Sequence, residues 1–140
     1  MKYIVYTDGG ARGNPGPAGI GFVIVEDGKT IKRGHAYIGE TTNNQAEYEA
    51  LIRAFQELEC IVPQQKRGDV HVEVRMDSEL VIKQLRREYK VKDAGLKLQF
   101  AKVGALILPF PNVTFKHIPR AQNAEADALA NEAMDNKNFK

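Results

Sequence analysis

Four acidic residues stand at positions where the side chains of a binding site are commonly found. Asp8 and Asp77 each follow a run of residues that predicts a β-strand, while Glu47 and Asp127 fall in the first turns of two predicted helices, on or beside their apolar faces. In an open α/β sheet, strand ends and helix starts meet at one edge, and ligands bind there. We therefore expect the four carboxylates to lie close together.

Each of these acids also has an ordinary structural interpretation. Asp8 could cap the turn that begins at Gly9, Asp77 could cap the helix that follows it, and Glu47 could complement the dipole of its own helix. Taken singly, none of these acids needs a functional explanation. The coincidence of four acids at one expected edge is what favours a shared site.

A cluster of four carboxylates requires compensating positive charge, because like charges at short range raise one another's pKa. No lysine or arginine lies near these acids in the sequence in a way that would neutralise all four. Oxygen ligands without cysteine or paired histidines select hard cations such as Mg²⁺, with Mn²⁺ as a substitute. Two such ions about 4 Å apart suit hydrolysis of a phosphodiester, because one activates water and the other stabilises the leaving oxygen.

The elements that would position these acids follow from the periodicity of the apolar residues. Alternating and β-branched runs predict strands, and apolar stripes at helical spacing predict helices. The predicted strands are 3–7, 20–25, 30–38, 70–76 and 113–118, and the predicted helices are 43–59, 79–88, 93–108 and 123–135. An early hairpin implies antiparallel pairing, while the later strand–helix–strand units imply parallel pairing. The fold class is therefore α/β, with a mixed sheet flanked by helices.

The glycine-rich segment 9–19 is expected to be a loop that leads from the first strand into the second. This order argues against nucleotide binding, because a phosphate-binding loop leads from a strand into a helix. No G-x-G-x-x-G spacing is present. The sequence Gly28-Lys29-Thr30 resembles the end of a P-loop, but Val23 stands where the first glycine of that motif is required.

The composition places limits on the class of protein. With 140 residues, 43% of them hydrophobic and 27% charged, we expect one domain over 1–140 with a frayed tail at 136–140. No apolar run approaches a membrane span and no secretory signal begins the chain, so no membrane partner is expected. The single cysteine, Cys60, excludes an internal disulfide and fits a reducing cytoplasm.

Charge gives only a local hint of a nucleic-acid partner. The net charge of +2 does not by itself indicate one. The run 86–92 is basic and contains Tyr89. Such a run is either a solvated face or a patch that contacts phosphates, and the sequence leaves both interpretations open.

Four motifs in this order resemble type 1 ribonuclease H, in the bacterial and archaeal subgroup that lacks a basic protrusion. The motifs are Tyr6-Thr7-Asp8-Gly9-Gly10, Thr41-Thr42-Asn43-Asn44-Gln45-Ala46-Glu47, Asp77-Ser78-Glu79 and Asn123-Ala124-Glu125-Ala126-Asp127. The resemblance implies a five-stranded mixed sheet in the order 3-2-1-4-5, flanked by helices. It also implies that Asp8, Glu47, Asp77 and Asp127 bind two Mg²⁺ ions with the substrate and hydrolyse the RNA strand of an RNA/DNA hybrid, leaving 3′-hydroxyl and 5′-phosphate ends.

The resemblance also implies a substrate-binding surface around these acids. Backbone groups without bulky side chains can approach the 2′-hydroxyls that distinguish RNA from DNA, and polar side chains can contact sugars, base edges and a phosphate of the DNA strand. The residues of this surface are Gly9, Gly10, Ala11, Arg12, Asn14, Thr42, Asn43 and Asn44. Asn14 has the alternative of forming a turn, and Thr42 and Asn43 have the alternative of capping the helix that follows.

The sequence departs from the family pattern in two places. The basic protrusion of many members is missing, so we expect weaker hybrid binding unless 86–92 replaces it. Many members also carry a mobile histidine before the last acid. Here His117 continues a predicted strand, which favours a structural role. Arg120 resembles the basic residue that replaces this histidine, so we count it among the catalytic residues; its alternative is a surface ion pair.

These features lead to one expected function and two alternatives. The expected protein is a monomeric, Mg²⁺-dependent endonuclease acting on RNA/DNA hybrids; whether it also cuts double-stranded RNA stays open. The first alternative is a hybrid- or dsRNA-binding module with weak or vestigial nuclease activity, which four intact acids disfavour. The second is an integrase-type or junction-resolving nuclease on the same fold, which the Asp-Gly-Gly and Thr-Asn-Asn motifs disfavour.

Overall fold

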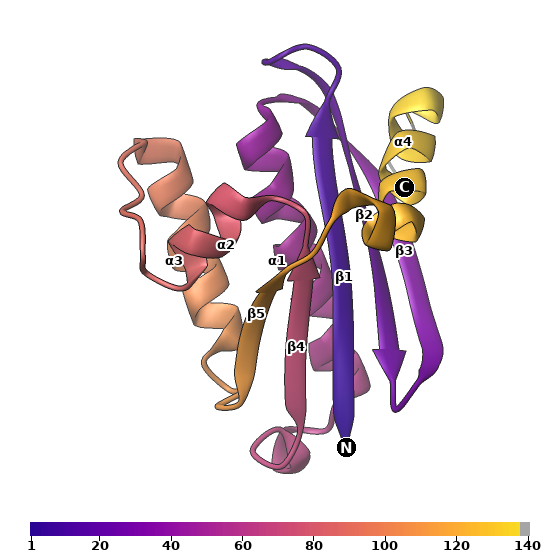
Figure 1. The fold of residues 1–140 in the computed structure, drawn as a ribbon, viewed down its shortest axis with the longest axis vertical. Helices are drawn as coiled ribbons and strands as arrows, with labels where there is room; N and C mark the ends of the chain where they lie inside the picture. The colour runs from indigo at the N-terminus through magenta and orange to yellow at the C-terminus, as the bar shows by residue number, and fades with distance from the viewer. Residues whose placement is uncertain (138–140) are drawn as a thin grey trace.

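The computed structural model describes residues 1–137, and its centre is a mixed five-stranded sheet (Figure 1). The strand order is β3-β2-β1-β4-β5, as the sequence predicts. β1 pairs antiparallel with β2 and parallel with β4, while β3 and β5 complete the two edges. The strands are β1 (Lys2–Ala11), β2 (Gly16–Glu26), β3 (Lys29–Thr41), β4 (His71–Met76) and β5 (Val113–His117).

The helices cover both faces of this sheet. α1 packs against β1 and β2 and is covered in turn by α3, whereas α4 packs on the opposite face against β2, β3 and β1. In the part of the chain that the structure describes, no helix combines the length and apolar composition that crossing a membrane requires. The helices are α1 (Asn43–Ile61), α2 (Glu79–Leu85), α3 (Ala94–Ile107) and α4 (Ala124–Asn136), with short 3₁₀ turns at η1 (Gln64–Lys66) and η2 (Arg120–Asn123).

The main core lies between the sheet and α1. Alternating residues of each central strand point to this face, as the period of a strand requires. Residues at helical spacing on α1 meet them, so the core combines the two periodicities that are visible in the sequence. Its fully or almost fully buried members include Val5, Ile20, Ile24, Leu51, Phe55, Leu58, Val72, Val74 and Met76.

The glycine-rich segment is not the long loop that the sequence suggested. β1 continues to Ala11 and β2 begins at Gly16, so only 12–15 connect the two strands. The glycines serve close packing instead. A Cβ atom on Gly19 would lie 2.7 Å from the carbonyl oxygen of Ala130 in α4, and one on Gly21, just beyond the segment, would lie 2.4 Å from that of Ala126. Glycine in β2 therefore lets a helix backbone rest directly on the sheet.

Several element boundaries also differ from the prediction. α2 ends at Leu85 instead of residue 88, and Arg87 then adopts a left-handed φ of 64° that ends the helical run. β3 extends to Thr41 because it stays paired with β2 up to Gly16. Asn136 is the last residue of α4, and 138–140, the rest of the expected frayed tail but for Lys137, lie outside the described residues.

Two glycine substitutions test the packing in opposite directions. Gly21→Ala should lower the free energy of unfolding by about 1–3 kcal/mol, because the new methyl group meets the backbone of α4. Gly104→Ala in α3 should raise it by about 1 kcal/mol, because no atom lies within 4 Å of the new methyl group and alanine favours a helix. Urea denaturation of both variants checks this. Equal effects of the two substitutions would contradict the close packing of α4 on β2.

Candidate active site

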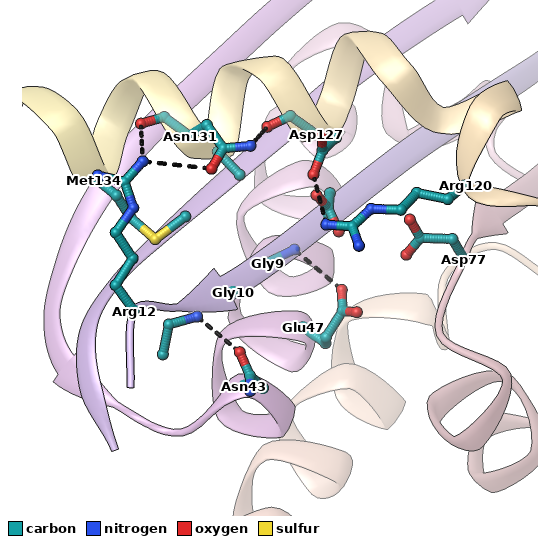
Figure 2. Close-up of a pocket in the computed structure, with 13 residues that line it drawn as sticks. Gly9, Gly10, Arg12, Asn43, Glu47, Asp77, Arg120, Asp127, Asn131 and Met134 are labelled. Carbon is teal, nitrogen blue, oxygen red and sulfur yellow. Dashed lines mark hydrogen bonds and ion pairs between the residues drawn. The ribbon is translucent and has the colours of Figure 1, made fainter. Parts of the chain in front are cut away.

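A pocket of about 350 Å³ opens where β1, α1 and α4 meet, and it contains all four predicted acids (Figure 2). The acids come from different elements: one lies on β1, one follows β4, one is in α1 and one is in α4. The pocket also contains a cation from η2. Its lining comprises Asp8, Gly9, Gly10, Ala11, Arg12, Asn43, Glu47, Asp77, Arg120, Asp127, Ala130, Asn131 and Met134.

The register of the sheet brings Asp8 and Asp77 together. The pairing of β1 with β4 stops at Tyr6 and Arg75, and β4 ends one residue later. β1 continues beyond this point, paired only with β2, so Asp8 lies within a strand and not at its tip as predicted. Asp77 follows the end of β4 directly. Both carboxylates therefore stand where the sheet opens, as the rule for open α/β sheets requires.

The contact between α1 and β1 places Glu47. A Cβ atom on Gly9 would lie 2.2 Å from the carbonyl oxygen of Ala46, so only glycine admits α1 at this distance. The amide of Gly9 donates a hydrogen bond to Oε1 of Glu47 at 3.0 Å. Glu47 is the fifth residue of α1, one position beyond the predicted first turn. Gly9 therefore allows the close approach of α1. Its predicted contact with the substrate stays a prediction.

Three of the four carboxylates lie close enough to share a cation. Single oxygens of Asp8, Glu47 and Asp77 lie within 4.8 Å of one another, and the side chains of Asp8 and Glu47 are buried. An all-oxygen donor set of this kind fits a hard divalent cation. Asp127 lies outside this group of three, and its Oδ1 accepts a hydrogen bond from Nη2 of Arg120 at 3.4 Å.

The site is electrostatically strained without a cation. Burial, then the charge of Asp77 and the neighbouring Asp127 carboxyl, raises the pKa of Asp8 to about 8. Burial also raises the pKa of Glu47 well above its ordinary value, and the charges of Asp8 and Asp77 add to this. The pKa of Asp77 is raised too, again chiefly by burial. A divalent cation would relieve both the repulsion and the loss of solvation.

Arg120 is the positive charge that proximity in the sequence did not reveal. Figure 2 shows its guanidinium between Asp127 and Asp77, and its charge opposes the rise in the pKa of Asp77, Asp8 and Glu47. The side chain is 79% exposed, so one arginine at the mouth of the pocket compensates the acids only in part. Arg120 lines the same pocket as the four acids, and its catalytic role stays a prediction.

The predicted substrate-binding residues divide into two groups. Gly9, Gly10, Ala11, Arg12 and Asn43 line the pocket with the acids, whereas Asn14, Thr42 and Asn44 lie outside its lining.

The polar side chains of this surface also make structural contacts. Thr42 Oγ1 accepts a hydrogen bond from the amide of Gln45 and caps α1, as the alternative interpretation proposed. Asn43 Oδ1 accepts one from the amide of Ala11, and Asn14 Oδ1 accepts one from the amide of Asn43. These bonds tie the β1–β2 connection to the start of α1.

α4 contributes pocket residues beyond Asp127 that were not predicted from the sequence. Asn131 and Met134 line the pocket four and seven residues after Asp127, which is the spacing of one helix face. That spacing was the available signal. Asn123 was quoted only as part of a motif, yet it is 1% exposed, and its Nδ2 donates to the carbonyl of Thr7 at 2.9 Å. Asn123 thereby fastens the start of α4 to β1 beside Asp8.

Comparison with known proteins relates the chain to nucleases. A family model described as reverse transcriptase-like matches residues 6–133. The ribonuclease HI of Halobacterium salinarum is 44% identical over 131 residues, which cover 93% of this chain and 63% of that protein. A bifunctional protein of Mycobacterium tuberculosis is 39% identical over 137 residues, which cover 96% of this chain and 36% of that protein. The chain thus spans less than two thirds of the length of either relative.

A solved structure shares both the fold and more than half of the sequence. The crystal structure of LC11-RNase H1 in complex with an RNA/DNA hybrid matches with a TM-score of 0.91 and 55% identity, over 96% of this chain and 98% of that chain. The agreement covers β1 through α4, so the elements that carry the four acids have counterparts in that structure.

The charge of the metal-free site predicts an unusual pH dependence. Because the pKa of Asp8 is about 8 in the folded protein, against an ordinary 3.8, the folded state retains a proton that the unfolded chain has already released. The free energy of unfolding should therefore fall as pH rises from about 4 to about 8. Asp8→Asn removes this loss and should stabilise the metal-free protein by about 1 kcal/mol or more near pH 8, and by less near pH 5.

Urea denaturation in EDTA across this pH range measures the effect. Asp69→Asn is the matched control, because Asp69 is exposed and lies outside the pocket. Added Mg²⁺ should stabilise the wild type more than Asp8→Asn, because binding to the folded state raises its stability. A constant effect of Asp8→Asn at every pH would refute the electrostatic account.

Proposed function

This chain belongs to the reverse transcriptase-like family, as a type 1 ribonuclease H of the bacterial and archaeal kind, and we propose that it hydrolyses the RNA strand of RNA/DNA hybrids. The observation that carries this proposal is the group of Asp8, Glu47 and Asp77, whose oxygens lie within 4.8 Å of one another in an open pocket. The relative crystallised with an RNA/DNA hybrid supports the choice of substrate.

We propose that Asp8, Glu47, Asp77 and Asp127 hold two Mg²⁺ ions when substrate is present, with Mn²⁺ as a substitute. When bound, such ions supply an activated water and stabilise the leaving oxygen, giving 3′-hydroxyl and 5′-phosphate ends. The chain supplies the framework for them. β1 holds one carboxylate on backbone that is paired in the sheet, the residue directly after β4 carries the second, and α1 holds the third against the amide of Gly9. Such rigid elements keep the ligands in place without reorganisation.

Recognition of RNA is proposed to occur beside the acids, at Gly10. The position of a Cβ atom on Gly10 has no neighbouring atom closer than 3.9 Å, so the pocket floor is open there. A ribose with its 2′-hydroxyl could approach the backbone at this point, next to Asn43. Asn14, Thr42 and Asn44 are proposed to contact the hybrid farther from the cut, with Thr42 at a phosphate of the DNA strand.

A panel of duplexes tests the proposed activity. The same labelled sequence is prepared as RNA/DNA, RNA/RNA, DNA/DNA and single strands, and each is incubated with Mg²⁺, Mn²⁺ or EDTA. We expect cleavage of the RNA strand of the hybrid with Mg²⁺ or Mn²⁺ and none with EDTA. Cutting of the DNA strand, or activity that survives chelation, would refute the proposal.

Asp8→Asn should abolish cleavage while leaving binding of the hybrid measurable, because it removes a ligand oxygen without removing the surrounding surface. Gel assays of cleavage and fluorescence anisotropy of a labelled hybrid measure the two properties. Asp69→Asn should retain both, since Asp69 is exposed and lies outside the pocket. Binding by the wild type with no cleavage under any metal would instead favour a binding module.

Arg120 is proposed to act in the reaction by contacting the phosphate or the attacking water. Its guanidinium lies between Asp127 and Asp77 and its side chain is largely exposed, so it can reach a substrate in the pocket (Figure 2). Arg120→Ala should lower kcat by about tenfold or more, and Arg120→Lys should restore part of the loss because it keeps the charge. Lys66→Ala, in η1, is the control. An unchanged kcat for Arg120→Ala would leave Arg120 as a surface ion pair.

A further inference from the structure

One side of the pocket carries a positive charge away from the clustered carboxylates. Arg12, at the connection between β1 and β2, reaches across to α4, where Asn131 and Met134 form the facing wall (Figure 2). Among the described residues that line the pocket, Arg12 and Arg120 are the cations. Arg120 interacts with the catalytic acids, so Arg12 is the cation that remains for another anionic group.

Three contacts hold the Arg12 guanidinium against α4. Its Nη2 donates to Oδ1 of Asn131 at 3.4 Å and to the carbonyl of Asn131 at 3.5 Å, and its Nη1 forms an ion pair with Asp135. The two hydrogen bonds are long and therefore weak. The ion pair is exposed, with side-chain exposures of 48% for Arg12 and 61% for Asp135, so it contributes little to stability. A stronger anion could displace Asp135 at small cost.

The position of Arg12 relative to the acids is nevertheless well defined. The amide of Arg12 donates to the carbonyl of Pro17 at 2.8 Å, which closes the turn between the strands. Asn131 Nδ2 donates to the carbonyl of Asp127 at 3.0 Å, so the residue that contacts Arg12 is anchored on the turn that carries a catalytic acid. The backbone of Arg12 and the residue that its guanidinium contacts therefore have defined places in the same pocket as the carboxylates.

Asp135 stands at an unfavourable position in its helix. It lies in the last turn of α4, where the helix dipole is negative and a carboxylate is disfavoured. Arg12 compensates this charge. A polyanionic strand entering the pocket would bring a phosphate to Arg12 in place of Asp135, and arginine binds phosphate through two parallel hydrogen bonds.

We propose that Arg12 binds a phosphate of the RNA strand next to the one that is cut, and that Asp135 is a built-in competitor that occupies Arg12 until the phosphate displaces it. This rests on the proposed function, because the carboxylates of the same pocket act on the adjacent phosphate. Asp135 then lowers the affinity for the hybrid and reduces its salt dependence, because the Asp135 carboxylate that is set free takes up cations, which offsets in part the counterions that the phosphate releases.

Asp135→Asn tests the competition directly. We expect KM for the RNA/DNA hybrid to fall about threefold at low salt with kcat unchanged, and the slope of log KM against log salt to steepen by about 0.7–0.9, the contribution of one phosphate contact. The matched control is Glu125→Gln. Glu125 is on α4, like Asp135, and its loss breaks the ion pair with Arg33 of β3. The change in net charge equals that of Asp135→Asn, and neither Glu125 nor Arg33 lines the pocket. The control should change KM by less than about 1.5-fold.

Arg12→Met completes a double-mutant cycle, because it keeps the apolar stem and removes the charge. It should raise KM and flatten the salt slope, and Asp135→Asn should then have no further effect in the Arg12→Met background. Arg12→Lys should restore part of the binding, which separates loss of the contact from loss of folding. The inference would be overturned if Asp135→Asn changed KM no more than Glu125→Gln does. It would also be overturned if Asp135→Asn still changed KM in the Arg12→Met background.

An uncharged linkage in place of one phosphate of the hybrid identifies the strand that Arg12 contacts. Hybrids with one methylphosphonate in place of a phosphate are prepared for successive positions of the RNA strand and of the DNA strand. The gain from Asp135→Asn should vanish at one RNA position adjacent to the cut. Loss of the gain at a DNA position would overturn the assignment to the RNA strand. If the wild type cuts no hybrid at all, the proposed function fails, and dissociation constants of the same variants still decide whether Arg12 and Asp135 compete for phosphate.

Discussion

The repulsion among three closely spaced carboxylates is the constraint on which the rest of the site depends. Asp8, Glu47 and Asp77 are held within 4.8 Å of one another, and burial together with mutual charge raises the pKa of each. Such an arrangement persists only where the surrounding structure determines it strongly. The sheet and the helices therefore have to resist the tendency of these side chains to separate, and a cation has to remove its cause.

Backbone contacts provide most of that resistance. α1 rests on β1 so closely that only glycine fits at position 9, and the amide of Gly9, beyond the last β1 residue that pairs with β4, holds Glu47. Asn123 fastens the start of α4 to β1 through the carbonyl next to Asp8. Since main-chain groups move less than long side chains, the carboxylates are positioned by the fold itself. Electrostatic strain in the metal-free state is the consequence, and a divalent cation bound between these carboxylates would relieve it.

The sequence allowed the strands, the helices and the four acids to be predicted because local periodicity decides where each element lies, whereas the strand order was predicted only through the resemblance to a known family. Asp77 follows a strand in which apolar and polar residues alternate, and this alternation shows which side chains of the strand face the core. The glycine-rich segment 9–19 was misjudged because the packing partners of Gly9 and Gly19 lie in α1 and α4, distant along the chain. Arg120 was recognised only by resemblance. The contact of Arg12 with Asn131 and Asp135 joins residues about 120 positions apart, and no spacing rule signals it.

The pocket is therefore divided between two kinds of control over a polyanionic substrate. On the proposed function, its acidic side repels phosphates until cations are bound, so that binding of the substrate would depend on the metal. Its opposite side offers Arg12, which is already paired with Asp135. A phosphate that replaces Asp135 therefore gains only the difference in binding free energy between the two partners of Arg12. The metal-free acids and the Arg12–Asp135 pair would both reduce non-specific attraction to nucleic acid. With a net charge of only +2, the selectivity of this chain has to come from the placement of its charges. An enzyme that has to release a cut strand benefits from the same restraint, because affinity that is equal for substrate and product does not accelerate the chemical step.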